Sequence, residues 1–251
     1  MINKIIIKII VIVTIIVLWQ ITVAILNVPT YIFPAPVKVF DALVEYRQII
    51  FISAIITMTE AFLGFLIANL VSITIALLIS FYKNLENIII PPAIVIKTMP
   101  IIAIAPLLTL WFGSGIFSKV VAAMLVCFFP ALVNVLRGVK SLNIELFWLF
   151  KIYSANKLQL IKKLILPGIL PYLFAAFKTS SSLAVVGALV GEFIGSNKGL
   201  GFLIMSNYYN MNIPLVFAAI TTSSIFGISF YYVIHFFEKK MVFDREKIEE
   251  G

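Results

Sequence analysis

The sequence predicts an all-α integral membrane protein with about six transmembrane helices. Of its 251 residues, 62% are hydrophobic and only 12% are charged, and the mean hydropathy is +1.13. Soluble domains carry roughly 25% charged residues, so lipid must be the solvent for part of this chain. Apolar stretches long enough to cross the ~30 Å hydrocarbon core recur along it. We expect one membrane domain over residues 1–251, with no separate soluble domain.

The expected spans are separated by short polar segments. They lie at 5–26, within 50–82, at about 90–112, and at 117–136, 170–194 and 213–237, the last five belonging to a core of residues 50–238. The third should be interrupted at Pro91-Pro92, Pro100 and Pro106, which is tolerated where neighbours satisfy the freed backbone groups. The first run has the length of a span and no small-residue cleavage site, which favours an uncleaved helix over a signal peptide.

Positive charge sets the expected orientation. With the N-terminus inside, the inner segments carry thirteen Lys and Arg residues, and the outer ones carry four, namely Lys38, Arg47, Lys119 and Lys198. The positive-inside rule therefore predicts that both termini are cytoplasmic. Because the charges cluster between apolar runs, the net charge of +8 indicates membrane retention rather than a nucleic-acid partner. The outer segment 28–49 should contain an amphipathic helix at the lipid surface, with Val37, Phe40, Leu43 and Val44 on its apolar face.

The longest hydrophilic stretch is the inner loop 137–168. It should form two short helices joined at Ser154-Ala155-Asn156, with Asn156 as an N-cap and Pro167 ending the second helix. Such a loop could be a basic surface helix resting on anionic lipid. It could instead be a rigid lever that transmits a push from a soluble partner.

The loop resembles the signature loop of permeases from binding-protein-dependent ATP-binding-cassette (ABC) importers. That pattern reads Glu-Ala-Ala, three residues, Gly, nine residues, then Ile-x-Leu-Pro. In this chain Trp148-Leu149-Phe150 stands at Glu-Ala-Ala, Ser154 at Gly, and Leu164-Ile165-Leu166-Pro167 at the close. The first two positions depart from the pattern. The resemblance implies an ATPase-coupling loop that includes Trp148, Leu149, Phe150, Ser154, Ala155, Leu158, Leu164, Leu166 and Pro167.

Motifs along residues 30–240 are similar to the nitrate, sulfonate and taurine permease branch, which also contains riboflavin and pyrimidine-precursor permeases. They are Phe33-Pro34-Ala35-Pro36, 57–65, 97–107, Trp111-Phe112-Gly113, Phe128-Phe129-Pro130, 187–194 and Gly199-Leu200-Gly201. This resemblance implies a type I (MetI-like) multi-pass permease in the cell (inner) membrane. Its implied partners are a second permease copy as a homodimer, two cytoplasmic ABC ATPase subunits and an extracytoplasmic solute-binding protein. The cargo would be a small anion or a vitamin precursor.

The chain has no Walker-type phosphate loop. We therefore expect a transport subunit, not an enzyme, that binds no cofactor or metal and relies on ATP used by its partner. An ATP-independent secondary transporter or channel is the alternative class. An intramembrane enzyme is disfavoured, because the chain has one histidine, His235, and no Asp within the spans.

Charged residues inside spans are costly and mark functional candidates. Glu60, Lys97 and Glu192 are candidates for the translocation pathway, with structural pairing as the alternative. Gly187, Gly191 and Gly195 should allow close helix packing. The hydroxyls of residues 179–182 could face a cavity or bond back to the backbone, and Cys127 should be a buried small hydrophobe.

Overall fold

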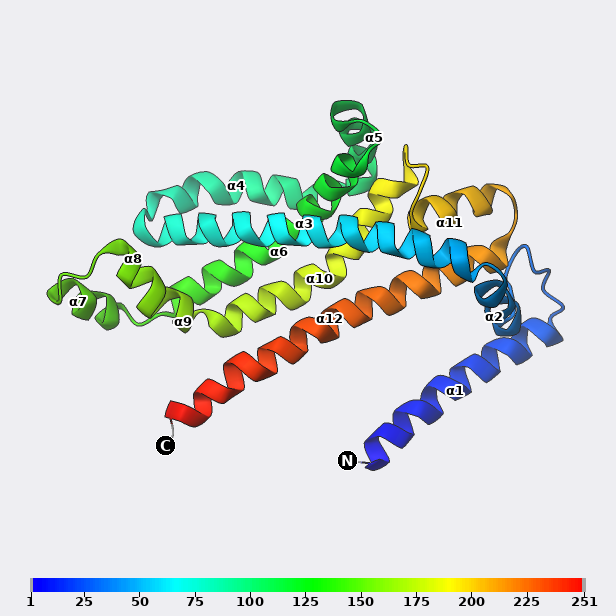
Figure 1. Ribbon diagram of the computed structural model, residues 1–251, viewed down its shortest axis with the longest axis horizontal. Helices are drawn as coiled ribbons and strands as arrows, with labels where there is room; N and C mark the ends of the chain where they lie inside the picture. The colour runs from blue at the N-terminus through cyan, green and yellow to red at the C-terminus, as the bar shows by residue number, and fades with distance from the viewer. Residues whose placement is uncertain (1, 250–251) are drawn as a thin grey trace.

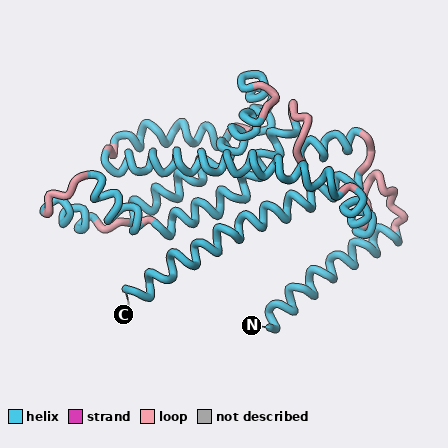
Figure 2. Tube along the Cα trace, in the orientation of Figure 1, coloured by secondary structure: helices cyan, strands magenta, loops and turns pink. Residues whose placement is uncertain are grey.

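Three long helices form the centre of the molecule in a computed structural model that describes residues 2–249. They are α3 (Arg47–Phe81), α6 (Ile116–Ser141) and α10 (Leu170–Phe193), and they pack side by side (Figure 1). Small residues bring them close. Ala123 of α6 is fully buried and lies directly against Gly64 of α3 and Gly187 of α10. Figure 2 shows helices throughout, and no strand occurs in residues 2–249.

The remaining helices surround this centre. The helix α12 (Ile213–Glu249) packs on α10 and on α11 (Leu200–Tyr209), and α2 (Pro36–Glu45) covers the end where α3 begins. The helix α1 (Ile2–Ile25) lies at the edge, where Trp19 packs against Phe33 and Phe217. We call the two ends of the bundle the α2 end and the α7 end. Figure 1 shows both chain termini directed away from the α2 end.

The third expected span is a broken helix pair. It consists of α4 (Asn84–Thr98) and α5 (Ile101–Phe112), which meet at an angle of 101°. The break lies at Met99-Pro100, where Met99 has the extended conformation that a following proline favours. The expected breaks at Pro91-Pro92 and Pro106 are wrong, since α4 and α5 continue through them. The carbonyls that Pro91 and Pro92 leave without partners belong to two exposed residues of α4.

The expected spans 50–82, 117–136, 170–194 and 213–237 correspond to α3, α6, α10 and α12. By length and composition, the described residues contain four spanning helices, or five if the bent pair counts as one span. The sixth expected span, 5–26, is helical as α1, but only Ile10–Ile25 qualifies as a shorter apolar helix. In α2, Val37, Phe40 and Val44 are exposed as expected for a lipid-facing side, while Leu43 packs partly against the core.

The inner loop forms two helical pieces, as predicted. The first is α7 (Ile144–Ile152); the second joins α8 (Lys157–Leu160), the π-helical turn η1 (Ile161–Ile165) and α9 (Leu166–Gly168). Asn156 caps α8 in a capping box with Gln159, which confirms the N-cap prediction. This helical piece ends at Gly168, one residue beyond Pro167, so the predicted end agrees to within one residue. Pro167 lies in the first turn of α9, directly after the wider π turn.

Several smaller expectations are confirmed. Cys127 is fully buried, and its Sγ donates to the Ser180 carbonyl at 3.1 Å. The hydroxyls of Thr179 and Ser181 bond back to the backbone of α10. Gly191 packs closely against α6, but Gly195 lies beyond the end of α10 with φ +72° rather than on its packing face. His235 is half-exposed and contacts Glu238 at 3.0 Å.

Candidate functional site

A buried polar cluster joins four helices where α10 ends and where α6 and α11 begin. Glu192, at the end of α10, is fully buried. Its Oε1 accepts the Thr57 hydroxyl at 2.7 Å, and its Oε2 accepts the Gly201 backbone N–H. Thr57 Oγ1 in turn accepts the Leu200 N–H at 2.8 Å. These bonds tie α3 and α10 to the first turn of α11, whose N–H groups otherwise have no helical partner.

Glu60 and Lys119 complete this cluster. Glu60 is 4% exposed and lies beside Glu192, and its Oε2 has no hydrogen-bond partner. Lys119 is 1% exposed, and its Nζ donates to the Ser114 carbonyl at 2.6 Å and the Gly195 carbonyl at 3.2 Å. Among the described residues Lys119 forms no ion pair within 4.0 Å of either carboxylate, so the two backbone carbonyls are what hold its ammonium group.

The position of Lys119 corrects the sequence analysis. It was expected among the outer loop charges, but it lies in the first turn of α6 and is buried against α10. A lysine so near a helix terminus normally extends to solvent, so its burial depends on contacts distant in the sequence.

The glycines of the Gly199-Leu200-Gly201 motif are explained by this cluster. Gly199 has φ +97°, and a Cβ there would overlap the Glu192 carboxylate. A Cβ at Gly201 would lie 2.5 Å from the Leu189 carbonyl and 2.7 Å from Glu192 Cβ. Only glycine allows this backbone to approach the carboxylate so closely.

The structure brings Glu60 and Glu192 together but leaves Lys97 apart. Lys97 is exposed at the end of α4, and its Nζ lies 4.7 Å from the centroid of the Phe129 ring. The three residues therefore do not form one site in this chain. Their assignment to the translocation pathway stays a prediction.

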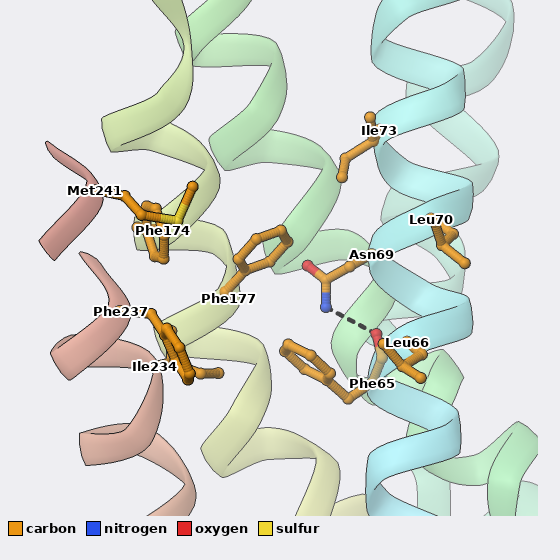
Figure 3. Close-up of a pocket in the computed structure, with 10 residues that line it drawn as sticks. All are labelled: Phe65, Leu66, Asn69, Leu70, Ile73, Phe174, Phe177, Ile234, Phe237 and Met241. Atoms are coloured by element: carbon orange, nitrogen blue, oxygen red, sulfur yellow. Dashed lines mark hydrogen bonds between the residues drawn. The ribbon is translucent and has the colours of Figure 1, made fainter. Parts of the chain in front are cut away.

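An apolar cavity of about 320 Å³ lies between α3, α10 and α12. Figure 3 shows Asn69 of α3 directed toward Phe177 of α10, with Phe237 and Met241 of α12 on the far side. The Asn69 amide nitrogen donates to the Phe65 carbonyl at 2.8 Å, while its oxygen has no partner. The described residues that line this cavity carry no charged side chain.

The helix α7 protrudes from the bundle at its far end (Figure 1). None of its nine residues is buried, although its sequence is mainly apolar. Ile152 and Tyr153 are each 78% exposed, and Trp148 and Leu149 are also exposed. Of the other expected coupling-loop residues, Leu158 is exposed, Leu166 and Pro167 are half-buried and Leu164 is buried in the bundle.

The backbone conformation of Ser154 explains why the family pattern has glycine at this position. The Ser154 N–H bonds to the Lys151 carbonyl and the Ala155 N–H to the Phe150 carbonyl, both at 3.0 Å, and Ser154 has φ +51°. These bonds form a Schellman motif, whose left-handed position favours glycine. A side chain at that position costs about 1–2 kcal/mol.

A Ser154→Gly variant is therefore expected to stabilise the end of α7 by about 1 kcal/mol. Slower hydrogen exchange at amides 150–157 would measure this. A Ser154→Val variant should have the opposite effect, because a β-branched side chain is worse in the left-handed region. Equal exchange in the two variants would contradict the role of this conformation.

Comparison with known proteins places these features in a family. Residues 68–243 match the family model described as the inner membrane component of binding-protein-dependent transport systems. This match covers more than two thirds of the chain, and the chain belongs to that family. It is therefore a multi-pass inner membrane permease with the MetI-like fold, the membrane subunit of a transport system.

Three similar relatives indicate the branch of the family to which the chain belongs. A probable ABC transporter permease protein of Haemophilus influenzae is 32% identical, over 86% of this chain and 89% of its own length. The formylaminopyrimidine transport permease protein of Halalkalibacterium halodurans is 33% identical, over 84% and 85% respectively. The riboflavin transport system permease protein of Chloroflexus aurantiacus is 31% identical, over 90% and 85%. Permeases named for aliphatic sulfonates, taurine and nitrate also match, so the chain lies in the expected branch.

Proposed function

We propose that this chain is the membrane-spanning subunit of an ATP-driven importer, and that a separate ATPase docks on α7. The observation that carries this proposal is α7 itself, an apolar helix at the end of the bundle with no buried residue. An exposed apolar surface of this kind marks a protein interface. The termini and α7 would then lie in the cytoplasm.

The face of α7 that points away from the bundle supplies the docking surface in this proposal. It carries Leu149, Ile152 and Tyr153, all exposed. The Schellman motif at Ser154 fixes the angle between α7 and α8, and the continuous helix from α8 to α9 leads into α10. Closure of the ATPase dimer would move α7, and this rigid connection would pass the movement to α10 and its buried cluster.

Complete assembly would require a second copy of the permease, two ATPase subunits and a solute-binding protein on the other side of the membrane. The relatives named for formylaminopyrimidine and riboflavin favour a small heteroaromatic vitamin precursor as cargo, with a sulfonate or nitrate-like anion as the alternative. Uptake of labelled representatives of both solute classes would separate the two.

The test of this proposal is purification of the tagged chain from its native membrane. We expect an ATP-hydrolysing subunit to copurify, and proteoliposomes of the complex to import solute only with ATP. ATP-independent flux through the purified chain would instead indicate a channel or secondary transporter.

A Leu149→Asp, Ile152→Asp double variant is expected to lose the ATPase while the permease remains folded, because both side chains are exposed and replacing them removes apolar contact area. ATPase recovery per permease would measure the effect. A Lys162→Asp, Lys163→Asp variant adds the same acids at exposed positions on η1 and serves as the control. Equal recovery in both variants would contradict docking on this face of α7.

A further inference from the structure

A second, larger hollow lies behind α7. This groove has a volume of about 1140 Å³ and is bordered by the end of α3, the start of α4, the end of α6, and α7 and α8. Its lining is largely apolar. The apolar side chains include Ile79, Leu136, Val139, Leu142, Phe147 and Leu160. Because the ends of three membrane helices border it, the groove lies at the level where hydrocarbon gives way to headgroups.

Lysines surround the groove. Lys83, Lys140, Lys151 and Lys157 line it, against the single acidic side chain of Glu86, which leaves a net charge of +3. Only Lys140 is paired, with Glu86; none of the other three has a carboxylate within 4 Å in the described part of the chain. The three unpaired lysines are exposed, and a positive charge concentrated in one groove attracts anions to it.

Two of the unpaired lysines are held in place by aromatic rings. The Lys157 Nζ lies 5.0 Å from the Tyr82 ring centroid and 3.1 Å from the Tyr82 hydroxyl. The Lys151 Nζ lies 5.1 Å from the Trp148 ring centroid. These contacts keep both ammonium groups at the groove without neutralising them.

The helix α7 presents two different faces. Five residues of α7 line the groove, namely Ile144, Phe147, Trp148, Phe150 and Lys151, and all but Phe150 follow the i, i+3, i+4 and i+7 spacing of one helical face. Leu149 and Ile152 do not line it and lie on the side assigned above to the ATPase. Because α7 has no buried residue, its groove face is also left uncovered. A partner for this face must suit both the lysines and the apolar lining of the groove.

We propose that this groove binds an anionic phospholipid, with its phosphate among Lys83, Lys151 and Lys157 and the start of an acyl chain on the apolar floor. Basic pockets between transmembrane helices on the cytoplasmic side bind such headgroups. A free phosphate would leave the apolar floor unused. A docked lipid would fill the space behind α7 and support it against the bundle. The proposal depends on the proposed function only for placing the α7 end in the cytoplasm.

The test uses the purified permease alone in a neutral detergent. Phosphatidylglycerol or phosphatidylcholine is added, and bound lipid is measured by native mass spectrometry together with the thermal midpoint. We expect phosphatidylglycerol to bind and stabilise selectively. A Lys83→Gln, Lys151→Gln, Lys157→Gln variant should bind it about a hundredfold more weakly, from roughly fivefold per lysine. A Lys162→Gln, Lys163→Gln variant, changed outside the groove, should bind as the parent does.

Several outcomes would overturn the proposal. These are equal phosphatidylglycerol binding by the groove variant and the parent, equal loss in the control variant, or equal binding of phosphatidylcholine. Displacement by inorganic phosphate would indicate a free-anion site. Protection of the groove lysines from acetylation by the copurified ATPase, with no lipid bound, would indicate a protein interface. No ATPase is needed for the lipid measurement, so its failure is distinguishable from failure of ATPase docking on the other face.

Discussion

A Glu192→Ala variant is expected to lose about 3–5 kcal/mol of stability, the combined cost of an unsatisfied buried donor and of the cavity that the side chain leaves. The change leaves the Gly201 N–H without its acceptor, and it removes the side chain to which the Thr57 hydroxyl donates. The thermal midpoint of the purified permease in mild detergent measures the loss.

Glu60→Gln is the matched control for this prediction. Glu60 is also buried in the cluster, but its Oε2 has no hydrogen-bond partner. Replacing its carboxyl group by an amide of similar shape keeps the side-chain volume and a group that can donate to Glu192, and it removes no hydrogen bond made by Oε2. We expect a change within about 1 kcal/mol. If the two variants lost the same stability, the hydrogen bonds of Glu192 would not be the reason for its burial.

A second substitution in this cluster distinguishes a structural role of Glu192 from a role in transport. A Glu192→Gln permease keeps the side-chain volume and one carbonyl acceptor, so a substantial part is expected to fold and assemble. If the assembled variant imports solute at the normal rate, Glu192 holds α3, α10 and α11 together and takes no part in the path. Impaired import by a fully assembled complex would support the pathway prediction.

The fold was largely predictable because membrane spans depend on local composition. Four of the predicted spans match α3, α6, α10 and α12, and the two-helix form of the inner loop follows from residues close together in the chain, such as Asn156 and Gln159. The proline breaks were less predictable. Proline favours an extended conformation of the preceding residue, but whether a helix tolerates it depends on its surroundings.

The polar cluster could not be assembled from the sequence. Glu60 and Glu192 were recognisable one by one as charges within spans, but nothing local indicates that they meet or that Lys119 joins them. Their meeting depends on the relative positions of α3, α6 and α10 along one another. One available signal was the Gly199-Leu200-Gly201 motif, since two glycines flanking one residue indicate a close backbone approach. The partner in that approach becomes evident only from the fold.

The relative positions of α3, α6 and α10 depend on the close contacts of Ala123. A Gly187→Ala variant tests these contacts. A Cβ at Gly187 would lie 2.6 Å from the Ala123 Cα and 3.1 Å from the Ala122 carbonyl. Both are backbone atoms of α6, so α10 itself must move, and such overpacking costs about 1–3 kcal/mol. The displacement would also pull Glu192, one turn and a half further along α10, away from Thr57. We expect a lower thermal midpoint and a weakening of the hydrogen bonds that join Glu192 and Thr57 to α11.

Gly227→Ala makes the same change in α12 and is the control. There a Cβ would lie 4.0 Å from the Val185 side chain, an ordinary contact. Alanine in a helix is favoured over glycine by up to about 1 kcal/mol, so this variant should be neutral or slightly stabilised. Because the helix-propensity gain is common to both variants, the two midpoints should differ by the equivalent of the overpacking cost, about 1–3 kcal/mol. Equal midpoints would mean that α6 and α10 do not pack as closely at Ala123 and Gly187 as the structure shows. The position of the polar cluster at the ends of these helices would then be contradicted as well.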